Sequence, residues 1–152
     1  MDKKDRCILA LLQADARLSN NEIAERVHLS PTACWKRIQQ LQRSGLIRRQ
    51  VCLLDNHKVG LGVTVFVSIK TNRHDLNWLE KFALGVKDMP EVMEFYRMTG
   101  ETDYLLKVVV PDIAGFDLVY KKLIQVAELF DVSSSFAMEE LKYTTALPLD
   151  YL

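Results

Sequence analysis

The chain has 152 residues, 49% of them hydrophobic and 26% charged, which is the composition of a globular protein that can bury a core. With 20 basic and 20 acidic side chains its net charge is zero, which by itself argues against a nucleic-acid partner. The charge is uneven, however, because residues 1–55 carry ten basic and six acidic side chains, whereas residues 56–152 carry ten and fourteen. Such asymmetry indicates one part that faces nucleic acid and a second part with another task.

Several classes of protein and site are disfavoured. No apolar run approaches the length of a membrane span, and the polar start Met1–Asp5 does not resemble a signal peptide. Neither the cysteines nor the histidines show metal-ligand spacing (Cys7, Cys34 and Cys52; His28, His57 and His74). We therefore expect a cytoplasmic protein with reduced thiols and with no metal or other cofactor. Cys34 and Cys52 are candidates for redox sensing, but a buried, inert thiol is the commoner role for a cysteine placed like Cys34.

Two short helices are predicted at the start of the chain. The first spans Asp5–Gln13 and turns its apolar side chains inward. The second spans Ser19–Val27 and opens with the pattern S-x-x-E, in which Ser19 and Glu22 each satisfy a free backbone amide of the other. A tight turn at residues 28–30 follows.

A third, basic helix is predicted over Pro31–Ser44. Ser30 caps it, proline fills its first position, and Gly45 suits the left-handed position after its end. Between Arg26 and Leu54 there are six basic and no acidic residues, as expected of a segment that approaches phosphates. Helix, short turn and basic helix is the arrangement with which small proteins read the major groove. The extended residues 46–54 suggest a small wing beside it.

A polar, glycine-containing linker, residues 55–62, separates this part from a second domain, in which the hydrophobic residues recur with a different period. The second domain is predicted to contain, in order, strand, helix, strand, strand, helix and strand (63–70, 76–86, 92–99, 104–110, 113–129 and 132–138). We therefore predict an α+β protein: a winged helix-turn-helix domain at 1–54, a linker at 55–62, and a βαββαβ ferredoxin-like domain at 63–152.

One face of the predicted sheet has no helix to cover it. Both helices should pack on the same face. Alternation puts one set of side chains on one face (Thr64, Phe66, Ser68, Leu105, Lys107 and Val109), and whichever set faces the helices, the opposite face keeps several large apolar groups. A second copy of the chain is the simplest cover, and we expect a homodimer through this domain.

Four motifs in the same order resemble the Lrp/AsnC (leucine-responsive regulatory protein, feast/famine) family over nearly the whole chain. They are the opening from Asp2 to Gln13, the segment from Leu29 to Ile47, the turn Gly100–Leu106, and the end from Ser134 to Leu149. The resemblance implies a DNA-binding transcription regulator of a bacterium or archaeon, without enzyme activity. It also implies dimers that assemble further, commonly into octamers, and an amino-acid effector bound between dimers near the G-x-x-D turn.

The residues expected to contact double-stranded DNA lie opposite the buried side of the third helix and on the wing. We assign Lys36 and Gln40 to base edges, since these side chains suit guanine and adenine. Ser30 and three arginines are assigned to phosphates, which makes the predicted DNA-binding set Ser30, Thr32, Ala33, Lys36, Arg37, Gln40, Arg43, Arg48 and Arg49. The alternative is an ordinary solvated basic face. Trp35 lies near the buried arc, so we interpret it as a core residue.

For the effector we expect a free amino acid, which needs partners of both polarities. Asp103 and Glu101 can accept from its ammonium group, and backbone amides of the Gly100 turn can hold its carboxylate. The predicted effector set is Met98, Gly100, Glu101, Thr102, Asp103, Ser134, Phe136 and Met138, with the methionines and Phe136 favouring an apolar or sulfur-containing side chain. Without the resemblance, Asp103 is better explained as a turn residue. Core filling explains Met98 and Met138 about as well as an effector pocket does.

Two other classes of protein, an enzyme and a protein-interaction module, fit the sequence less well. An enzyme needs a nucleophile and a base, and the sequence offers no Ser/His/Asp or Cys/His grouping and no glycine-rich phosphate loop. A metabolite-binding ferredoxin-like module that acts through protein–protein contacts is the alternative, and a neutral or acidic third helix would have favoured it.

Overall fold

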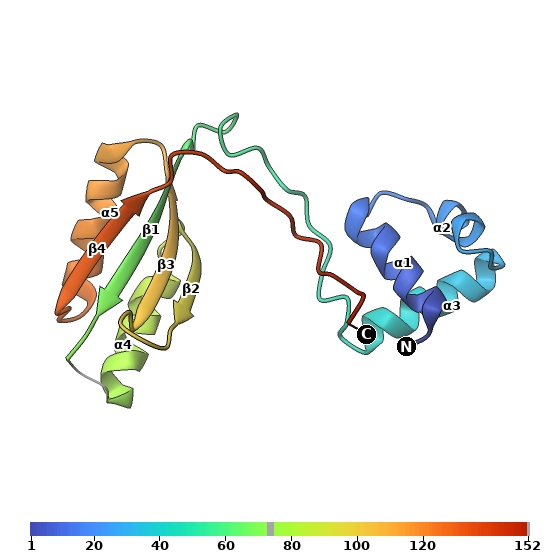
Figure 1. Cartoon of the computed structure of the whole chain (residues 1–152), viewed down its shortest axis with the longest axis horizontal. Coiled ribbons are helices and arrows are strands. Elements are labelled where there is room, and N and C mark those ends of the chain that lie inside the picture. The colour runs from blue at the N-terminus through green and yellow to red at the C-terminus, as the bar shows by residue number, and fades with distance from the viewer. Residues whose placement is uncertain (73–74, 152) are drawn as a thin grey trace. The chain divides into compact units, whose positions relative to one another are not determined.

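The computed structural model describes residues 1–72 and 75–151 and contains two compact units (Figure 1). The helical unit consists of residues 1–53 together with 141–152, and the sheet unit consists of residues 54–140. His74 and Leu152, which fall within the predictions above, lie outside the described residues.

The helical unit contains α1 (Lys3–Ala14), α2 (Asn20–Arg26) and α3 (Pro31–Arg43). Each helix contributes to one small core of Ile8, Leu9, Ile23, Ala24, Val27, Cys34 and Leu41. The N-terminal caps predicted from the sequence are present: Ser19 and Glu22 form a reciprocal capping box, and the Ser30 hydroxyl accepts from the Ala33 amide at 3.2 Å. Gly45 has a φ of 78° and ends α3 as expected.

The first helix begins earlier than the sequence predicted, because a second capping box starts it. Asp2 is the N-cap residue, and Asp5 occupies the position that glutamate usually fills. The Asp5 amide donates to Asp2 Oδ1 at 2.9 Å, and the Asp2 amide donates to Asp5 Oδ2 at 3.0 Å. The shorter aspartate side chain made this box invisible to a search for S-x-x-E.

The C-terminal segment folds with the helical unit. The Gln13 side-chain amide makes two hydrogen bonds with the Leu147 backbone. It donates to the carbonyl at 3.1 Å and accepts from the amide at 2.7 Å. Leu149 packs against the helical core. The domain boundaries predicted from the sequence place residues 141–152 in the second domain, because this extended tail has no helix or strand periodicity that shows which unit it contacts.

The wing predicted at residues 46–54 contains no strand. All residues from 44 to 62 are described, and none of them belongs to a helix or strand. Residues 46–54 are therefore not paired as a strand with any described segment, and a strand needs such pairing of its backbone groups. The linker contains hydrogen-bonded turns: Asp55 accepts from the amides of His57 and Lys58, and Asn56 exchanges hydrogen bonds with Leu61.

The sheet unit has the predicted order of elements. It contains β1 (Val63–Lys70), α4 (Leu76–Lys87), β2 (Val92–Arg97), β3 (Tyr104–Val110), α5 (Ile113–Val126) and β4 (Asp131–Phe136). The strands form one antiparallel sheet in the order β2-β3-β1-β4, with Val65 opposite Val108 and Val67 opposite Ser134. This is the ferredoxin-like arrangement that the sequence predicted.

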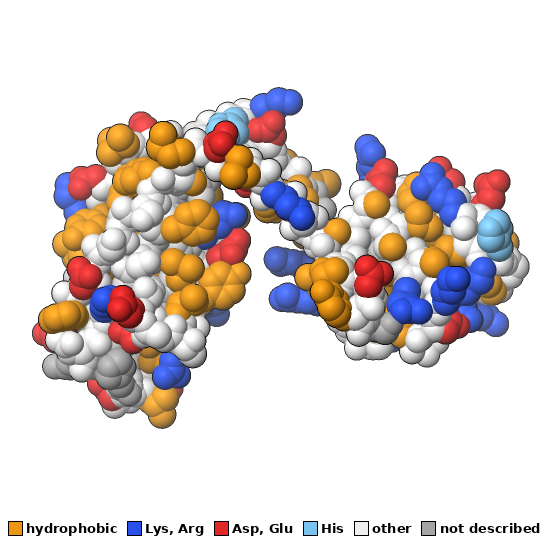
Figure 2. Space-filling view, viewed as in Figure 1, with side chains coloured by type: hydrophobic (Ala, Val, Ile, Leu, Met, Phe, Trp, Pro, Cys, Tyr) orange, Lys and Arg blue, Asp and Glu red, His pale blue; other side chains and the backbone are white. Residues whose placement is uncertain are grey.

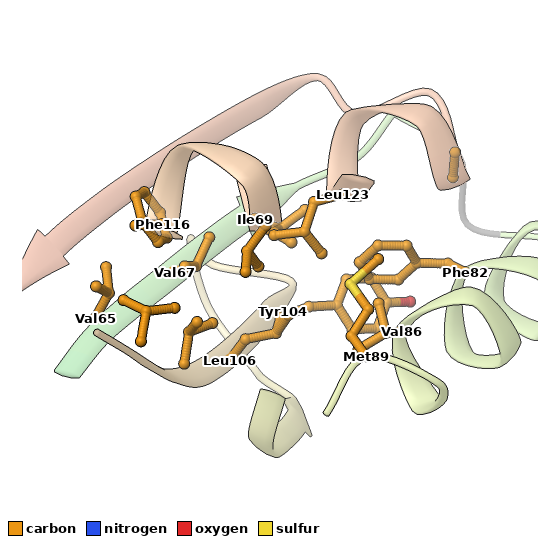
Figure 3. Close-up of a cluster of buried hydrophobic side chains, with 14 of the residues drawn as sticks. Val65, Val67, Ile69, Phe82, Val86, Met89, Tyr104, Leu106, Phe116 and Leu123 are labelled. Carbon is orange, nitrogen blue, oxygen red and sulfur yellow. The ribbon is translucent and has the colours of Figure 1, made fainter. Parts of the chain in front are cut away.

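Both helices of the sheet unit cover the same face of the sheet, and the main core lies between them and the strands (Figure 3). Alternate residues of β1 and β3 point into this core, which the side chains of Phe82, Val86, Phe116 and Leu123 complete from the helices. Trp78 stacks on Phe82 with ring centroids 5.0 Å apart, and its indole N–H donates to the Glu128 carbonyl at 3.1 Å.

The opposite face of the sheet has no covering element in the sheet unit. The intervening residues of β1 and β3 lie there, and Phe66 has 40% of its surface exposed. Tyr96 and Met98, which follow the same alternation on the β2 side, are also exposed, whereas Lys107 lies beside Glu94 with a nitrogen–oxygen distance of 3.5 Å.

Candidate nucleic-acid interface and effector region

The outer face of α3 presents the polar and basic side chains expected of a reading helix. Ser30, Thr32, Lys36, Gln40 and Arg43 are exposed, and Ala33 is half-buried. Arg48 and Arg49 follow the helix and are exposed as well. Figure 2 shows Lys and Arg side chains over the visible face of the helical unit. A cationic helix face of this kind is suited to phosphates and base edges of a duplex.

The turn between α2 and α3 has a defined geometry. His28 adopts the left-handed conformation with a φ of 53°, its amide donates to the Glu25 carbonyl, and the Leu29 amide donates to the Ala24 carbonyl. This is the Schellman pattern, with histidine in the place that glycine usually takes. The Asn20 amide nitrogen donates to the Pro31 carbonyl at 2.8 Å, which ties the starts of α2 and α3 together.

One residue of the predicted DNA-binding set is engaged inside the helical unit. Arg37 Nη1 lies 2.7 Å from Asp2 Oδ2 and 2.7 Å from Asp5 Oδ1. The hydrogen bonds with Asp5 and Asp2 raise the pKa of the Arg37 guanidinium. The Asp5 amide and the guanidinium together lower the pKa of the Asp2 carboxyl. Arg37 therefore neutralises carboxylates of its own chain.

The interpretation of Trp35 as a core residue was wrong. Its side chain is 51% exposed on α3, beside Lys36. Its neighbour Cys34 fills the buried position instead, and burial raises the pKa of that thiol. An aromatic ring on the outer face offers apolar surface to a partner such as the thymine methyl group. On a helical wheel with Cys34, Ile38 and Leu41 inward, Trp35 lies about 100° from Cys34 at the flank of the buried side, so the wheel alone does not decide its exposure.

The turn between β2 and β3 is built around Asp103. The Asp103 amide donates to the Ile69 carbonyl at 3.0 Å, and its carboxylate accepts from the Thr71 amide at 2.8 Å. The Met98 amide donates to the Asp103 carbonyl, and Gly100 has a φ of 100° that favours glycine. These contacts fix the turn against the end of β1, so Asp103 has the structural role that turn chemistry alone suggested.

The predicted effector residues do not all come together within one chain. Met98, Gly100, Glu101, Thr102 and Asp103 share the end of the sheet where Ile69 pairs with Tyr104. Ser134 pairs with Val67 and Phe136 with Val65, so Phe136 lies four residues, or about 13 Å, along the sheet from that end. Met138 follows β4 and is 96% exposed.

The described residues contain neither a candidate metal site nor a candidate membrane-spanning helix. Within residues 1–72 and 75–151, no three His, Cys, Asp or Glu side chains are grouped closely enough to hold a metal ion. In that same part of the chain, no helix combines the length and apolar character that crossing a membrane requires.

A capped basic reading helix on one unit and a ferredoxin-like sheet on the other define a two-domain DNA-binding regulator, and the comparisons agree. Residues 1–48 match the winged helix-turn-helix DNA-binding domain, and residues 64–147 match the Lrp/AsnC ligand binding domain. The chain belongs to the Lrp/AsnC family of transcription regulators.

Similar proteins cover the chain from end to end. The DNA-binding transcriptional activator DecR of Escherichia coli K12 is 50% identical over 151 residues, which are 99% of each chain. An AsnC family transcriptional regulator from Agrobacterium tumefaciens is 56% identical, with a TM-score of 0.97 over 100% of this chain and 99% of that one. A transcriptional regulator from Neisseria meningitidis in complex with L-Met is 39% identical, with a TM-score of 0.95 over 99% and 98%.

Proposed function

We propose that this regulator reads its DNA sites by placing α3 in the major groove. The observation that carries the proposal is the capped helix whose outer face bears Lys36, Gln40 and Arg43, with no acidic residue between Arg26 and Leu54. Lys36 and Gln40 contact base edges there, and Thr32 and Ala33 lie on the same face. Ser30, Arg43, Arg48 and Arg49 contact phosphates and set the register.

The test is binding to duplexes selected by the protein from a random-sequence library, measured by fluorescence anisotropy over a range of salt concentrations. Lys36→Ala is expected to relax the preference at one base position, because it removes a base contact. Arg43→Gln is expected to reduce the slope of log affinity against log salt by about one, because one counterion fewer is released. Lys81→Ala, an exposed lysine of the sheet unit, is the matched control. If no duplex is preferred at physiological salt, the proposal fails.

The proposed effector is a free amino acid with an apolar or sulfur-containing side chain. The complex of the Neisseria meningitidis relative with L-Met supports this class. Exposed Glu101 accepts from the ammonium group, and amides of the Gly100 turn, which includes Thr102, hold the carboxylate, while Asp103 keeps the turn in place. Methionine should therefore raise the melting temperature, since a ligand that binds only the folded form stabilises it. Glu101→Gln should abolish that rise, and no shift with any of the twenty amino acids would refute the proposal.

We further propose that the open face of the sheet packs on a second copy and that the dimers assemble further, with an octamer as the end state. Exposed Phe66 and Tyr96 provide the apolar surface. A second copy also offers a way to unite the Gly100 turn of one chain with Ser134, Phe136 and Met138 of another. Phe66→Glu is expected to yield monomers in light scattering, because it places a charge in that interface. An unchanged mass would contradict this assembly.

The relatives are transcription regulators, and the protein is proposed to act in the cytoplasm on chromosomal DNA without catalysing a reaction. The amino acid changes DNA binding by favouring one assembly state over another. Light scattering and DNA affinity measured with and without methionine test this coupling, which is refuted if neither quantity responds to any amino acid.

A further inference from the structure

The first turn of α1 contacts both helices of the helix-turn-helix. Asp2 and Asp5 receive the guanidinium of Arg37 from α3, at 2.7 Å each. Between them in the sequence, the Lys4 ammonium donates to the carbonyl of Val27, which is the C-cap residue of α2. One turn of helix thus holds the end of α2 and the middle of α3.

Backbone amides at the start of α1 hold both aspartate side chains in place, independently of Arg37. Asp2 uses Oδ1 for the Asp5 amide and Oδ2 for Arg37, and Asp5 uses Oδ2 for the Asp2 amide and Oδ1 for Arg37. Each carboxylate therefore holds the helix start with one oxygen and Arg37 with the other. The position of the guanidinium is thereby tied to the backbone of α1.

This arrangement sets how α3 is rotated about its axis. Arg37 directly follows Lys36 and precedes Gln40 by three residues, so the three side chains turn together. The side chain of Arg37 is 33% exposed, that of Asp5 16% and that of Asp2 53%, so the contact with Asp5 lies at the edge of the core and the contact with Asp2 lies nearer to solvent. A change of a few degrees in this rotation would move the ends of Lys36 and Gln40 away from base edges.

The charges around Arg37 distinguish its two possible roles, which are contact with a DNA phosphate and positioning of α3. An arginine that neutralises a phosphate must be free of stronger anionic partners, whereas this one already contacts two carboxylates. Two aspartates beside a duplex would also repel its phosphates. We propose that Arg37 is a positioning residue for DNA reading, which holds α3 in its reading orientation through the Asp2–Asp5 capping box. This inference rests on the proposed contacts of Lys36 and Gln40.

The test compares Arg37→Gln, Asp5→Asn and Asp2→Asn with wild type on the selected duplex and on an unrelated duplex. Arg37→Gln and Asp5→Asn are expected to weaken specific binding roughly tenfold, the factor that a hydrogen bond to a charged group contributes. Binding to the unrelated duplex and the salt slope are expected to remain at wild-type values. The Arg37→Gln/Asp5→Asn double variant should lose no more affinity than Arg37→Gln alone, because Arg37→Gln already breaks the contact that Asp5→Asn removes.

Arg43→Gln serves as the matched control, since its slope is expected to fall by about one. If Arg37→Gln lowers the slope in the same way, or if Asp5→Asn tightens binding by removing a repulsive charge, the inference is overturned. Asn is a good N-cap, so Asp2→Asn keeps the helix start and carries the test if Arg37→Gln does not fold. Absence of specific binding by wild type would instead refute the proposed function.

Discussion

Gly85 allows α4 and α5 to approach closely. Its replacement by alanine has two opposing effects on stability, a gain in helix propensity and a clash with Val126. Gly85 lies near the end of α4, and an added Cβ would lie 2.3 Å from Cγ1 and 2.8 Å from Cγ2 of Val126. Unstrained carbon atoms pack at about 3.5–4.0 Å, so Val126 or a helix must move.

The expected magnitude follows from these two effects. Helix propensity alone predicts that Gly85→Ala stabilises the sheet unit by about 1 kcal/mol. Overpacking a filled site costs about 1–3 kcal/mol, and the contact with Val126 places this site toward the upper end of that range. We therefore expect a net destabilisation of about 1–2 kcal/mol, or roughly 4–8 °C in melting temperature for each kcal/mol.

The assay is urea unfolding followed by circular dichroism on four proteins: wild type, Gly85→Ala, Val126→Ala and the double variant. Removing the γ carbons of Val126 leaves only its Cβ near the added methyl group, at 3.1 Å. In the Val126→Ala background, Gly85→Ala is therefore expected to be less destabilising than in the wild-type background, because the clash with the γ carbons is gone and only the 3.1 Å contact opposes the gain in helix propensity. A stabilising effect in the wild-type background, or additive effects of the two changes, would refute the reasoning.

Three further predictions concern the helical unit. His28→Gly is expected to raise its free energy of unfolding by up to about 1 kcal/mol in denaturant titration, because glycine adopts the left-handed conformation without the clash of a Cβ; a loss of stability would show that the imidazole has a contact worth more than this strain. Leu149→Ala is expected to destabilise the three helices by about 1–2 kcal/mol, since its side chain packs on their core, and unchanged hydrogen exchange in α1 would contradict that packing. Iodoacetamide at pH 8 should modify Cys7 and Cys52 in the native protein and spare Cys34, which is buried and whose pKa burial raises; equal rates at all three, followed by mass spectrometry, would contradict this.

The sequence determined the elements whose signals are local. The cap at Ser30, the capping box of Ser19 and Glu22, and the left-handed Gly45 depend on residues no more than four positions apart. Alternation in β1 and β3 likewise predicted which side chains share a face of the sheet, and the structure shows which of the two faces the helices cover. From these the helix-turn-helix and the βαββαβ order followed, whereas the strands of a wing at residues 46–54 did not form.

Only the tertiary structure decided the contacts between distant segments. Arg37 was placed on the outer face by its position on the helix, yet it pairs with Asp2 and Asp5, more than thirty residues away. The tail that contacts Gln13 is separated from it by 134 residues and has no periodic pattern of its own. Helix and strand periods describe each element alone, whereas the partner of a charged or extended segment depends on which surfaces folding brings within hydrogen-bonding distance.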